Sequence, residues 1–146
     1  MEHKIYLSYG SNLNIGQMQH RCPHAKIIVS TILKGYRLLF RGTDGNAVAT
    51  IEPCESECVP ALLWSISPRD ERKLDYYENY PELYRKENLR IKTANGAEIE
   101  AMAYIMNDKY PIATPNNKYF NSILKGYITA GFDTTKLYMA ANMEIP

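Results

Sequence analysis

Two short stretches of the chain hold side chains suited to binding an anion and moving a proton. Residues 9–13, Tyr-Gly-Ser-Asn-Leu, follow directly on a strand-forming segment that begins at Lys4. The glycine permits a sharp turn, and the hydroxyl and amide groups beside it bring hydrogen-bond donors and acceptors to one point. The second stretch ends at Glu78, whose carboxyl group falls on the same helical stripe as Leu74 and Tyr77. These stretches are the candidates for a small-molecule site.

The first stretch suits an anion because residues 14–21 can start a helix immediately after it. Asn12 or Asn14 can cap that helix, and the free N–H groups of the loop then face its positive end. An ordinary strand-to-helix turn accounts for the same residues, since Gly-Ser-Asn is common in turns. Taken alone, the loop leaves both interpretations open.

Glu78 is the best single candidate for acid–base catalysis. Ser67-Pro68 offers a serine cap and a proline at the first helical position, which predicts a helix from Arg69 to about Tyr77 or Glu78. The negative helix end and partial burial among Tyr76, Tyr77 and Tyr80 both disfavour the ionised form, so we expect a raised pKa for Glu78. A carboxyl group near neutrality can shuttle protons at pH 7. The pattern fits equally a glutamate whose stem packs on Tyr77 while its head reaches water.

Two other chemistries find weaker support in the sequence. Ser–His–Asp catalysis using Ser11 with His20 or His24 stays open, because triads are defined by geometry and not by order. Cys54 and Cys58 are spaced as C-x3-C, and His20, Cys22 and His24 alternate in a short segment, so a zinc site has to be considered. Such a site needs three or four firm ligands, so free thiols and solvated histidines are the favoured interpretation.

The composition narrows the possible partners. The chain has 17 Lys and Arg against 16 Asp and Glu, a formal net charge of +1, without a basic stripe for nucleic acid. Its first residues lack the apolar core of a signal peptide, and no apolar run approaches the ~20 residues that cross a bilayer. Three cysteines, an odd number, suit a reducing compartment. We therefore expect one cytoplasmic domain over residues 1–146, with no membrane or nucleic-acid partner.

Tyrosine is unusually frequent in this chain. There are 12 tyrosines and only 3 phenylalanines. A ring with a polar tip suits a cleft that is apolar in its body and hydrogen-bonding at its floor.

The elements that must position these residues point to an α+β domain. A final helix capped by Asn116 or Asn117 should end at Gly131, and the tail from Phe132 to Pro146 is ambiguous. Besides the strand at Lys4, the predicted strands are Lys26–Arg41 with a bend at Gly35, Ala47–Glu52, Cys58–Ile66, Tyr84–Thr93 and Ala97–Met106, with a polar loop at Pro53–Glu57 and a hairpin turn at Asn95-Gly96. This pattern predicts a strongly bent sheet or small mixed β-barrel with a few flanking helices.

Both stretches resemble signatures of the γ-glutamylcyclotransferase-like family, which includes the plant avirulence-induced proteins. Residues 6–13, followed by Arg21-Cys22-Pro23, resemble the family's Tyr-Gly-Ser-Asn-Leu signature. Residues 74–81, with Tyr84-Arg85 after them, are similar to its Leu-Asp-x-x-Glu-Gly-x-Pro and Tyr-Arg pattern. Two motifs in the right order are more specific than either alone. Asn79 departs from the usual glycine, but asparagine tolerates the left-handed conformation.

The resemblance implies a barrel-like fold with a pocket between the loop and the glutamate. It also implies conversion of a γ-glutamyl amine or γ-glutamyl peptide into 5-oxoproline and a free amine, without a metal or cofactor. Position by position, Glu78 matches the acid/base glutamate. The positions that match substrate-binding residues are Tyr9, Gly10, Ser11, Asn12, Leu13, Tyr84 and Tyr119.

Several alternatives stay open at this stage. A non-catalytic member of the same fold, binding a small ligand or a partner protein through the same pocket, is the alternative to the enzyme. The signatures read only the glutamyl half of a substrate, so the leaving amine is unspecified. The loop can hold either the α-carboxylate or the developing oxyanion, and the oligomeric state is open.

Overall fold

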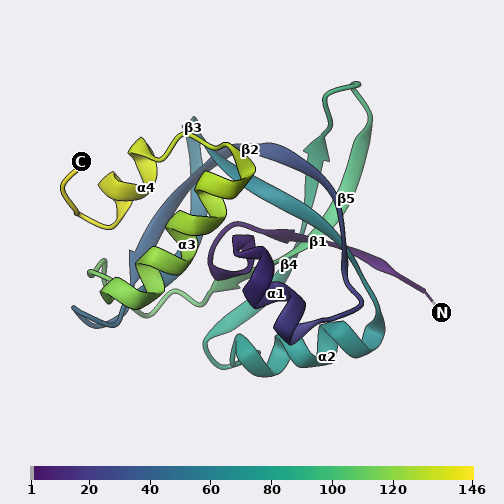
Figure 1. The fold of residues 1–146 in the computed structure, drawn as a ribbon, viewed down its shortest axis with the longest axis horizontal. Helices are drawn as coiled ribbons and strands as arrows, with labels where there is room; N and C mark the ends of the chain where they lie inside the picture. Colours follow the sequence, from purple (N-terminus) through teal and green to yellow (C-terminus); the bar gives the residue numbers. More distant parts are fainter. Residues whose placement is uncertain (1) are drawn as a thin grey trace.

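The central strand of the sheet carries the candidate loop. A computed structural model describes residues 2–146, and in them a five-stranded sheet runs in the order β2-β3-β1-β5-β4 (Figure 1). Strand β1 (Lys4–Ser8) is antiparallel to β3 (Val48–Ile66) and parallel to β5 (Glu98–Met106). The outer strands β2 (Lys26–Arg41) and β4 (Tyr84–Lys92) pair antiparallel with β3 and β5. The loop after β1 therefore leaves the middle of the sheet.

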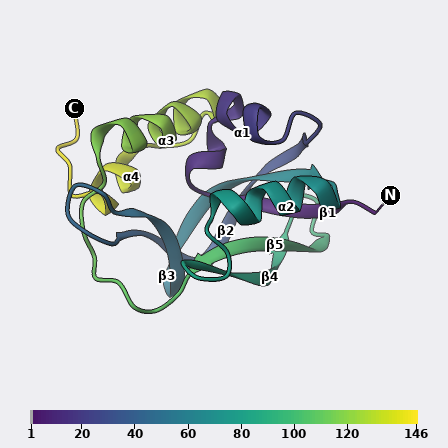
Figure 2. The same cartoon turned by 90° about the horizontal axis from the view of Figure 1, so that it is seen from below.

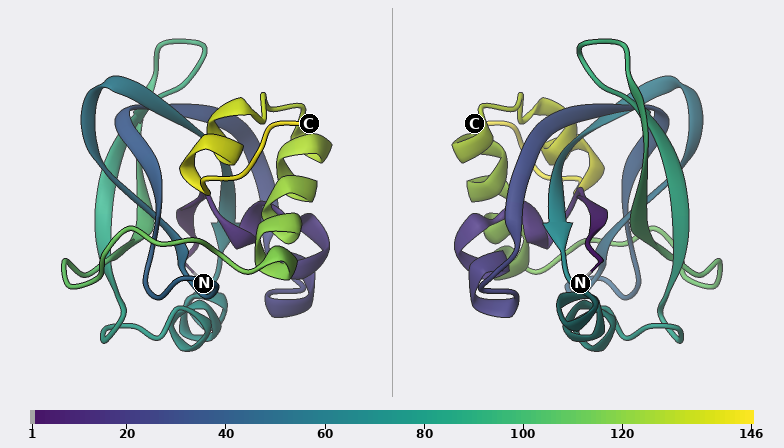
Figure 3. Two further views of the ribbon diagram at one scale, coloured as in Figure 1. Left: turned by 90° about the vertical axis from the view of Figure 1, so that its left-hand side faces the viewer. Right: turned by 90° about the vertical axis from the view of Figure 1, so that its right-hand side faces the viewer.

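The α+β class predicted from the sequence is confirmed. The strands curve strongly around the core in both views of Figure 3. In the described part of the chain, no pairing joins the outer strands β2 and β4. The sheet is therefore bent like the expected barrel without being closed.

Strands β2 and β3 accommodate extra residues where they bend. The sequence predicts a polar loop at Pro53–Glu57, and this prediction is wrong because β3 runs straight through it. Lys34 pairs with Cys58 and Tyr36 with Pro53, so the residues between Pro53 and Cys58 oppose Gly35 alone. Gly35 has a φ of 83°, which only glycine adopts without strain, and this confirms the predicted bend.

The caps read from the sequence begin the two long helices. Ser67 Oγ accepts from the Asp70 N–H at 3.1 Å and the Asp70 carboxylate accepts from the Ser67 N–H at 2.9 Å, a reciprocal capping box. Asn116 accepts from the Tyr119 N–H at 2.7 Å, and Gly131 ends the same helix with a φ of 77°. Within residues 2–146 the helices are a 3-10 turn η1 (Ser11–Leu13), α1 (Ile15–Arg21), α2 (Pro68–Tyr77), α3 (Asn117–Ala130) and α4 (Thr135–Ala140) in the formerly ambiguous tail.

Helices α1 and α3 lie on the same side of the sheet and meet where Asn14 and Gln17 at the start of α1 contact Ser122 of α3 (Figure 2). Asn14, rather than Asn12, caps α1, with its side chain accepting from the Gln17 N–H at 3.0 Å. The Asn14 amide also donates to the Ser122 carbonyl of α3 at 3.1 Å.

Among residues 2–146, none of these helices combines the length and apolar character that a membrane crossing requires.

Helix α3 comes so close to the candidate loop that only glycine fits at the contact. A Cβ atom at position 126 would lie 2.6 Å from the carbonyl carbon of Leu13 and 2.7 Å from its oxygen. Leu13 is completely buried there. The backbone of α3 at Gly126 therefore packs directly against the backbone of Leu13 in the loop.

We expect Gly126→Ala to destabilise the protein by about 1–3 kcal/mol, because the added methyl group must displace the Leu13 backbone. Gly16→Ala is the matched control, since Gly16 lies in α1 and its nearest neighbour to a new Cβ is Asn14 Oδ1 at 3.5 Å. That control should raise stability by about 0.5–1 kcal/mol through the higher helix propensity of alanine. Denaturant unfolding of both variants measures the difference, and equal stabilities would contradict the close packing described.

Candidate active site

A narrow cavity lies where the loop after β1 meets the end of α2. Its volume is about 30 Å³, enough for one or two water molecules. The residues that line it are Tyr6, Tyr9, Gly10, Ser11, Asn12, Ala49, Glu78, Tyr84, Tyr104 and Tyr119. The structure thus brings together all the residues matched to the family site except Leu13, which supports the loop from the core.

Glu78 is presented to the cavity by the last turn of α2. Its N–H donates to the Leu74 carbonyl at 2.8 Å, which holds the residue at the helix end. The next residue, Asn79, turns the chain away with a φ of 51°, the left-handed conformation that asparagine tolerates. Burial raises the pKa of Glu78 from 4.5 to about 7, and the positive charge of Arg21 acts in the opposite direction. The direction is the one expected from the sequence, but the expected surroundings are wrong: Tyr76, Tyr77 and Tyr80 are exposed, and other tyrosines line the cavity around Glu78.

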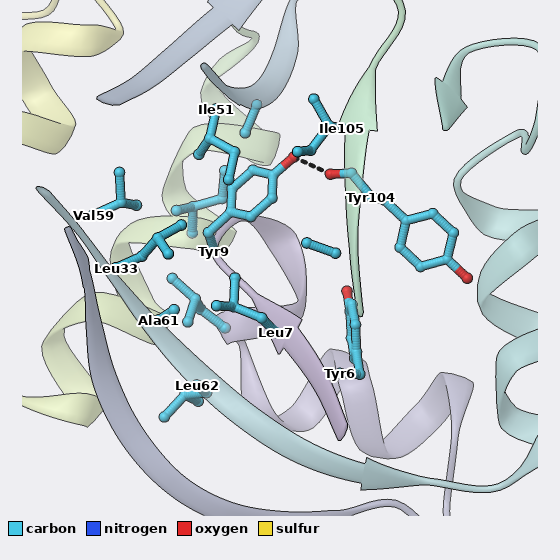
Figure 4. Packing of buried hydrophobic residues seen from close by; sticks show 14 of the residues in the cluster. Tyr6, Leu7, Tyr9, Leu33, Ile51, Val59, Ala61, Leu62, Tyr104 and Ile105 are labelled. Carbon is cyan, nitrogen blue, oxygen red and sulfur yellow. Dashed lines mark hydrogen bonds between the residues drawn. The ribbon is translucent and has the colours of Figure 1, made fainter. Parts of the chain in front are cut away.

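Tyrosine hydroxyl groups fix the cavity walls to the backbone of the sheet. Tyr9 donates to the Tyr104 carbonyl at 2.5 Å (Figure 4). Tyr84 donates to the Ala49 carbonyl at 2.5 Å, and the Ala49 N–H donates to the Tyr119 hydroxyl at 3.0 Å. Burial raises the pKa of Tyr9 and of Tyr84, with nearby charges, including that of Glu78, adding to the effect. These rings therefore form a neutral, rigid wall around one carboxyl group.

The loop itself is held by a chain of side-chain contacts. The Asn12 amide donates to the Tyr6 hydroxyl at 3.0 Å and accepts from the Arg21 guanidinium at 2.8 Å. The same Arg21 nitrogen lies 3.4 Å from Ser11 Oγ. Its guanidinium carbon sits 4.5 Å from the ring centre of Tyr77, the neighbour of Glu78. Arg21 thus bridges the two halves of the site.

Backbone donors remain in this loop for an anionic group. The Leu13 N–H donates to the Gly10 carbonyl at 3.0 Å and is therefore used by the chain. In the hydrogen bonds of residues 2–146, the N–H groups of Ser11 and Asn12 have no acceptor, although both residues line the cavity. Two adjacent N–H groups at the start of a 3-10 turn suit a carboxylate or an oxyanion.

A second network pins α2 to the sheet and so fixes the position of Glu78. The Tyr104 hydroxyl donates to the Asp75 carboxylate at 2.6 Å. The Lys86 ammonium group pairs with Asp75 at 2.9 Å and with Glu71 at 2.7 Å, and Lys4 pairs with Glu71 at 2.9 Å. Helix α2 is therefore tied to β1, β4 and β5 along one face.

The geometry does not assemble a serine triad. Ser11 Oγ lies against Arg21, and in residues 2–146 neither His20 nor His24 bonds to it. Over the same described range, no three side chains of His, Cys, Asp or Glu gather as a metal site would require. Cys22 is buried, and Cys54 and Cys58 are free thiols.

Four residues of the site were not among those predicted from the sequence. Tyr6 and Tyr104 lie on the neighbouring strands β1 and β5, with ring centres 5.9 Å apart. Ala49 enters the site from β3, and Arg21 enters from the end of α1. The arginine follows the loop motif closely in sequence, so its presence in the extended signature was the available signal.

Comparisons with known proteins agree with the family signatures. Residues 6–123 match the family described as gamma-glutamyl cyclotransferase, AIG2-like. The gamma-glutamylcyclotransferase of Homo sapiens is 26% identical over 130 residues, covering 84% of this chain and 69% of the human protein. A solved gamma-glutamyl cyclotransferase has a TM-score of 0.85 at 24% identity, covering 99% of this chain and 90% of its own. The yeast cyclotransferase specific to glutathione has a TM-score of 0.64 at 12% identity, covering 97% and 98%.

We expect Glu78→Gln to be more stable than the parent at pH 8 by about 1–3 kcal/mol, because each unit of pKa shift corresponds to about 1.4 kcal/mol. The folded pKa of about 7 lies above the ordinary 4.5, so ionising Glu78 costs the parent stability as pH rises between these values. Below pH 4.5 the carboxyl group is protonated in both states, and the advantage of the variant should disappear. Urea unfolding across this pH range checks the prediction.

The exposed Glu82→Gln provides the matched control, because it makes the same chemical change four residues later on the surface. If Glu82→Gln increased the free energy of unfolding at pH 8 as much as Glu78→Gln, the cause would be the change in net charge and not the burial of Glu78.

Proposed function

We propose that this protein, which belongs to the gamma-glutamyl cyclotransferase, AIG2-like family, converts a γ-glutamyl amine or γ-glutamyl peptide into 5-oxoproline and a free amine. The supporting observation is a single partly buried carboxyl group, Glu78, with a pKa of about 7, facing a loop with two unused N–H groups. That combination supplies one group to move a proton and donors for the negative oxygens of a glutamyl group.

In the proposed reaction the α-amino nitrogen of the substrate attacks its own γ-carbonyl carbon. A C–N bond forms inside the glutamyl group, and the C–N bond to the leaving amine breaks. One proton passes from the α-amino group to the leaving nitrogen, and Glu78 carries it, first as the carboxylate base and then as the carboxylic acid. The atoms balance without water or a co-reactant.

Because the attack is intramolecular, the protein's main tasks are to curl the glutamyl chain and to stabilise charge. We assign the N–H groups of Ser11 and Asn12 to the anionic oxygens of the glutamyl group. A glutamyl group needs more room than about 30 Å³, so side chains at the cavity mouth must shift when the substrate binds.

We expect Glu78→Gln to lose about 10²–10⁴-fold in kcat for 5-oxoproline release, the range typical of removing a general acid–base group. The glutamine keeps the size of the side chain, so the fold should persist, and circular dichroism can verify it. The assay measures 5-oxoproline from a panel of γ-glutamyl amino acids and γ-glutamyl amines, with Glu82→Gln as the active control.

If Glu78→Gln were as active as the parent, the proposed mechanism would be wrong. Absence of turnover by the parent across the panel, together with saturable thermal stabilisation by a γ-glutamyl compound, would instead favour the non-catalytic binding protein.

We also expect Arg21→Gln to move the acidic limb of kcat/KM to higher pH by about half a pH unit to one pH unit. The base must be ionised in the free enzyme, and loss of the nearby positive charge raises the pKa of Glu78 further. Arg21→Lys keeps the charge while losing the planar hydrogen-bonding group, so its limb should stay near that of the parent. If the acidic limb of kcat/KM lay at the same pH in Arg21→Gln and in the parent, the charge of Arg21 would not act on Glu78.

A further inference from the structure

The charges of α2 are divided between two faces of the helix. Its acidic residues are all engaged on one side, with Asp70 in the capping box and Glu71 and Asp75 bound to Lys86. Arg69 and Arg72 are exposed, and no ion pair in residues 2–146 involves either of them. One face of α2 is therefore uncompensated and positive.

That face lines an open groove of about 480 Å³ between α2 and the end of α1. Arg69, Arg72, Lys73 and Tyr76 recur at i, i+3, i+4 and i+7, which places them along one side of the helix. Arg21 closes the groove from α1, and no aspartate or glutamate lines it. Tyr76 is 83% exposed, so the groove also offers an aromatic face to a ligand.

The groove and the candidate active site share a boundary. Arg21 lines the groove while bonding to Asn12 at 2.8 Å on the cavity side. Tyr77 lines the groove, and the next residue is Glu78. The two hollows have no lining residue in common, and Arg21 and Tyr77 stand between them, so a leaving portion that extends past Glu78 reaches the groove over these two side chains.

We propose that this groove is the subsite for the leaving amine and that it selects γ-glutamyl peptides whose leaving portion carries two or more carboxylates. The inference rests on the proposed function. Arginine guanidinium groups bind carboxylates in a fork of parallel hydrogen bonds, and the row on α2 offers several such donors in succession. Neutral leaving amines gain nothing there, and cationic ones are repelled.

Helix stability does not explain this arrangement. Arg69 stands in the first turn of α2, where the helix dipole disfavours a positive side chain. The acidic residues of the same turn already serve the cap and the lysine network. These unpaired cations line the groove from the first turn of α2 towards the helix end that carries Glu78, and a ligand in the groove accounts for them.

The test compares kcat/KM for γ-glutamyl-glutamate and γ-glutamyl-glutamine, two dipeptides of almost equal size that differ by one carboxylate on the leaving residue. We expect the parent to prefer the glutamate compound by about tenfold, mainly through KM, as a few screened charge-assisted hydrogen bonds provide. Added salt should reduce this preference because it shortens the range of the interaction.

The double variant Arg69→Gln/Arg72→Gln removes two exposed charges, and glutamine is a good helix former, so α2 should persist. In this variant the ratio of kcat/KM for the two dipeptides should be close to one. Arg90→Gln/Lys92→Gln removes the same charge from exposed positions of β4 and should keep the parental ratio. A parental ratio of one, or an unchanged ratio in Arg69→Gln/Arg72→Gln, overturns the subsite while leaving the cyclotransferase proposal standing. Absence of 5-oxoproline from every dipeptide overturns the proposed function and this inference with it.

Discussion

The burial of one carboxyl group, that of Glu78, is the constraint on which the site depends. In water such a group is ionised at pH 7 and is a weak base, whereas burial in this cavity raises its pKa to about 7. The tyrosines around Glu78 bury its carboxyl group and carry no charge that could stabilise the ionised form. The hydroxyl groups of Tyr9, Tyr84 and Tyr119 are hydrogen-bonded to backbone groups. Arg21 limits the rise in pKa from the rim.

This burial requires α2 to end at one place. The capping box at Ser67 fixes where the helix begins, and the left-handed Asn79 fixes where it stops. Between them, Lys86 holds the acidic face of α2 on the sheet. The opposite face is left positive and exposed, so the contacts that position the base also leave a cationic groove between α2 and the end of α1.

Local sequence signals predicted much of this arrangement. The cap at Ser67-Pro68 and the turn after β1 each follow from a few neighbouring residues, and the structure confirms them. The pKa of Glu78 shifts in the predicted direction, but tyrosines of other elements, such as Tyr84, Tyr104 and Tyr119, provide the burial. The loop predicted at Pro53–Glu57 failed because Pro53 and Cys58, at either end of the polar residues, both pair with β2, so the strand continues through residues 54–57 as a bulge opposite Gly35.

The remaining parts of the site depend on contacts between segments that are distant in sequence. Tyr104 reaches the cavity only because β5 lies beside β1. Leu13 belongs to the loop signature, yet the approach of Gly126 places it in the core and not in the cavity wall. Such placements follow from tertiary packing, which no local pattern encodes.

The most direct measurement of the central claim is a ¹³C NMR titration of the glutamate carboxyl groups, with the Glu78 signal assigned by its loss in Glu78→Gln. Burial predicts a midpoint near pH 7 for this carboxyl group in the folded protein. A midpoint at the ordinary 4.5 would contradict the account, because Glu78 would then be a solvated carboxylate without the basicity that the proposed proton transfer requires.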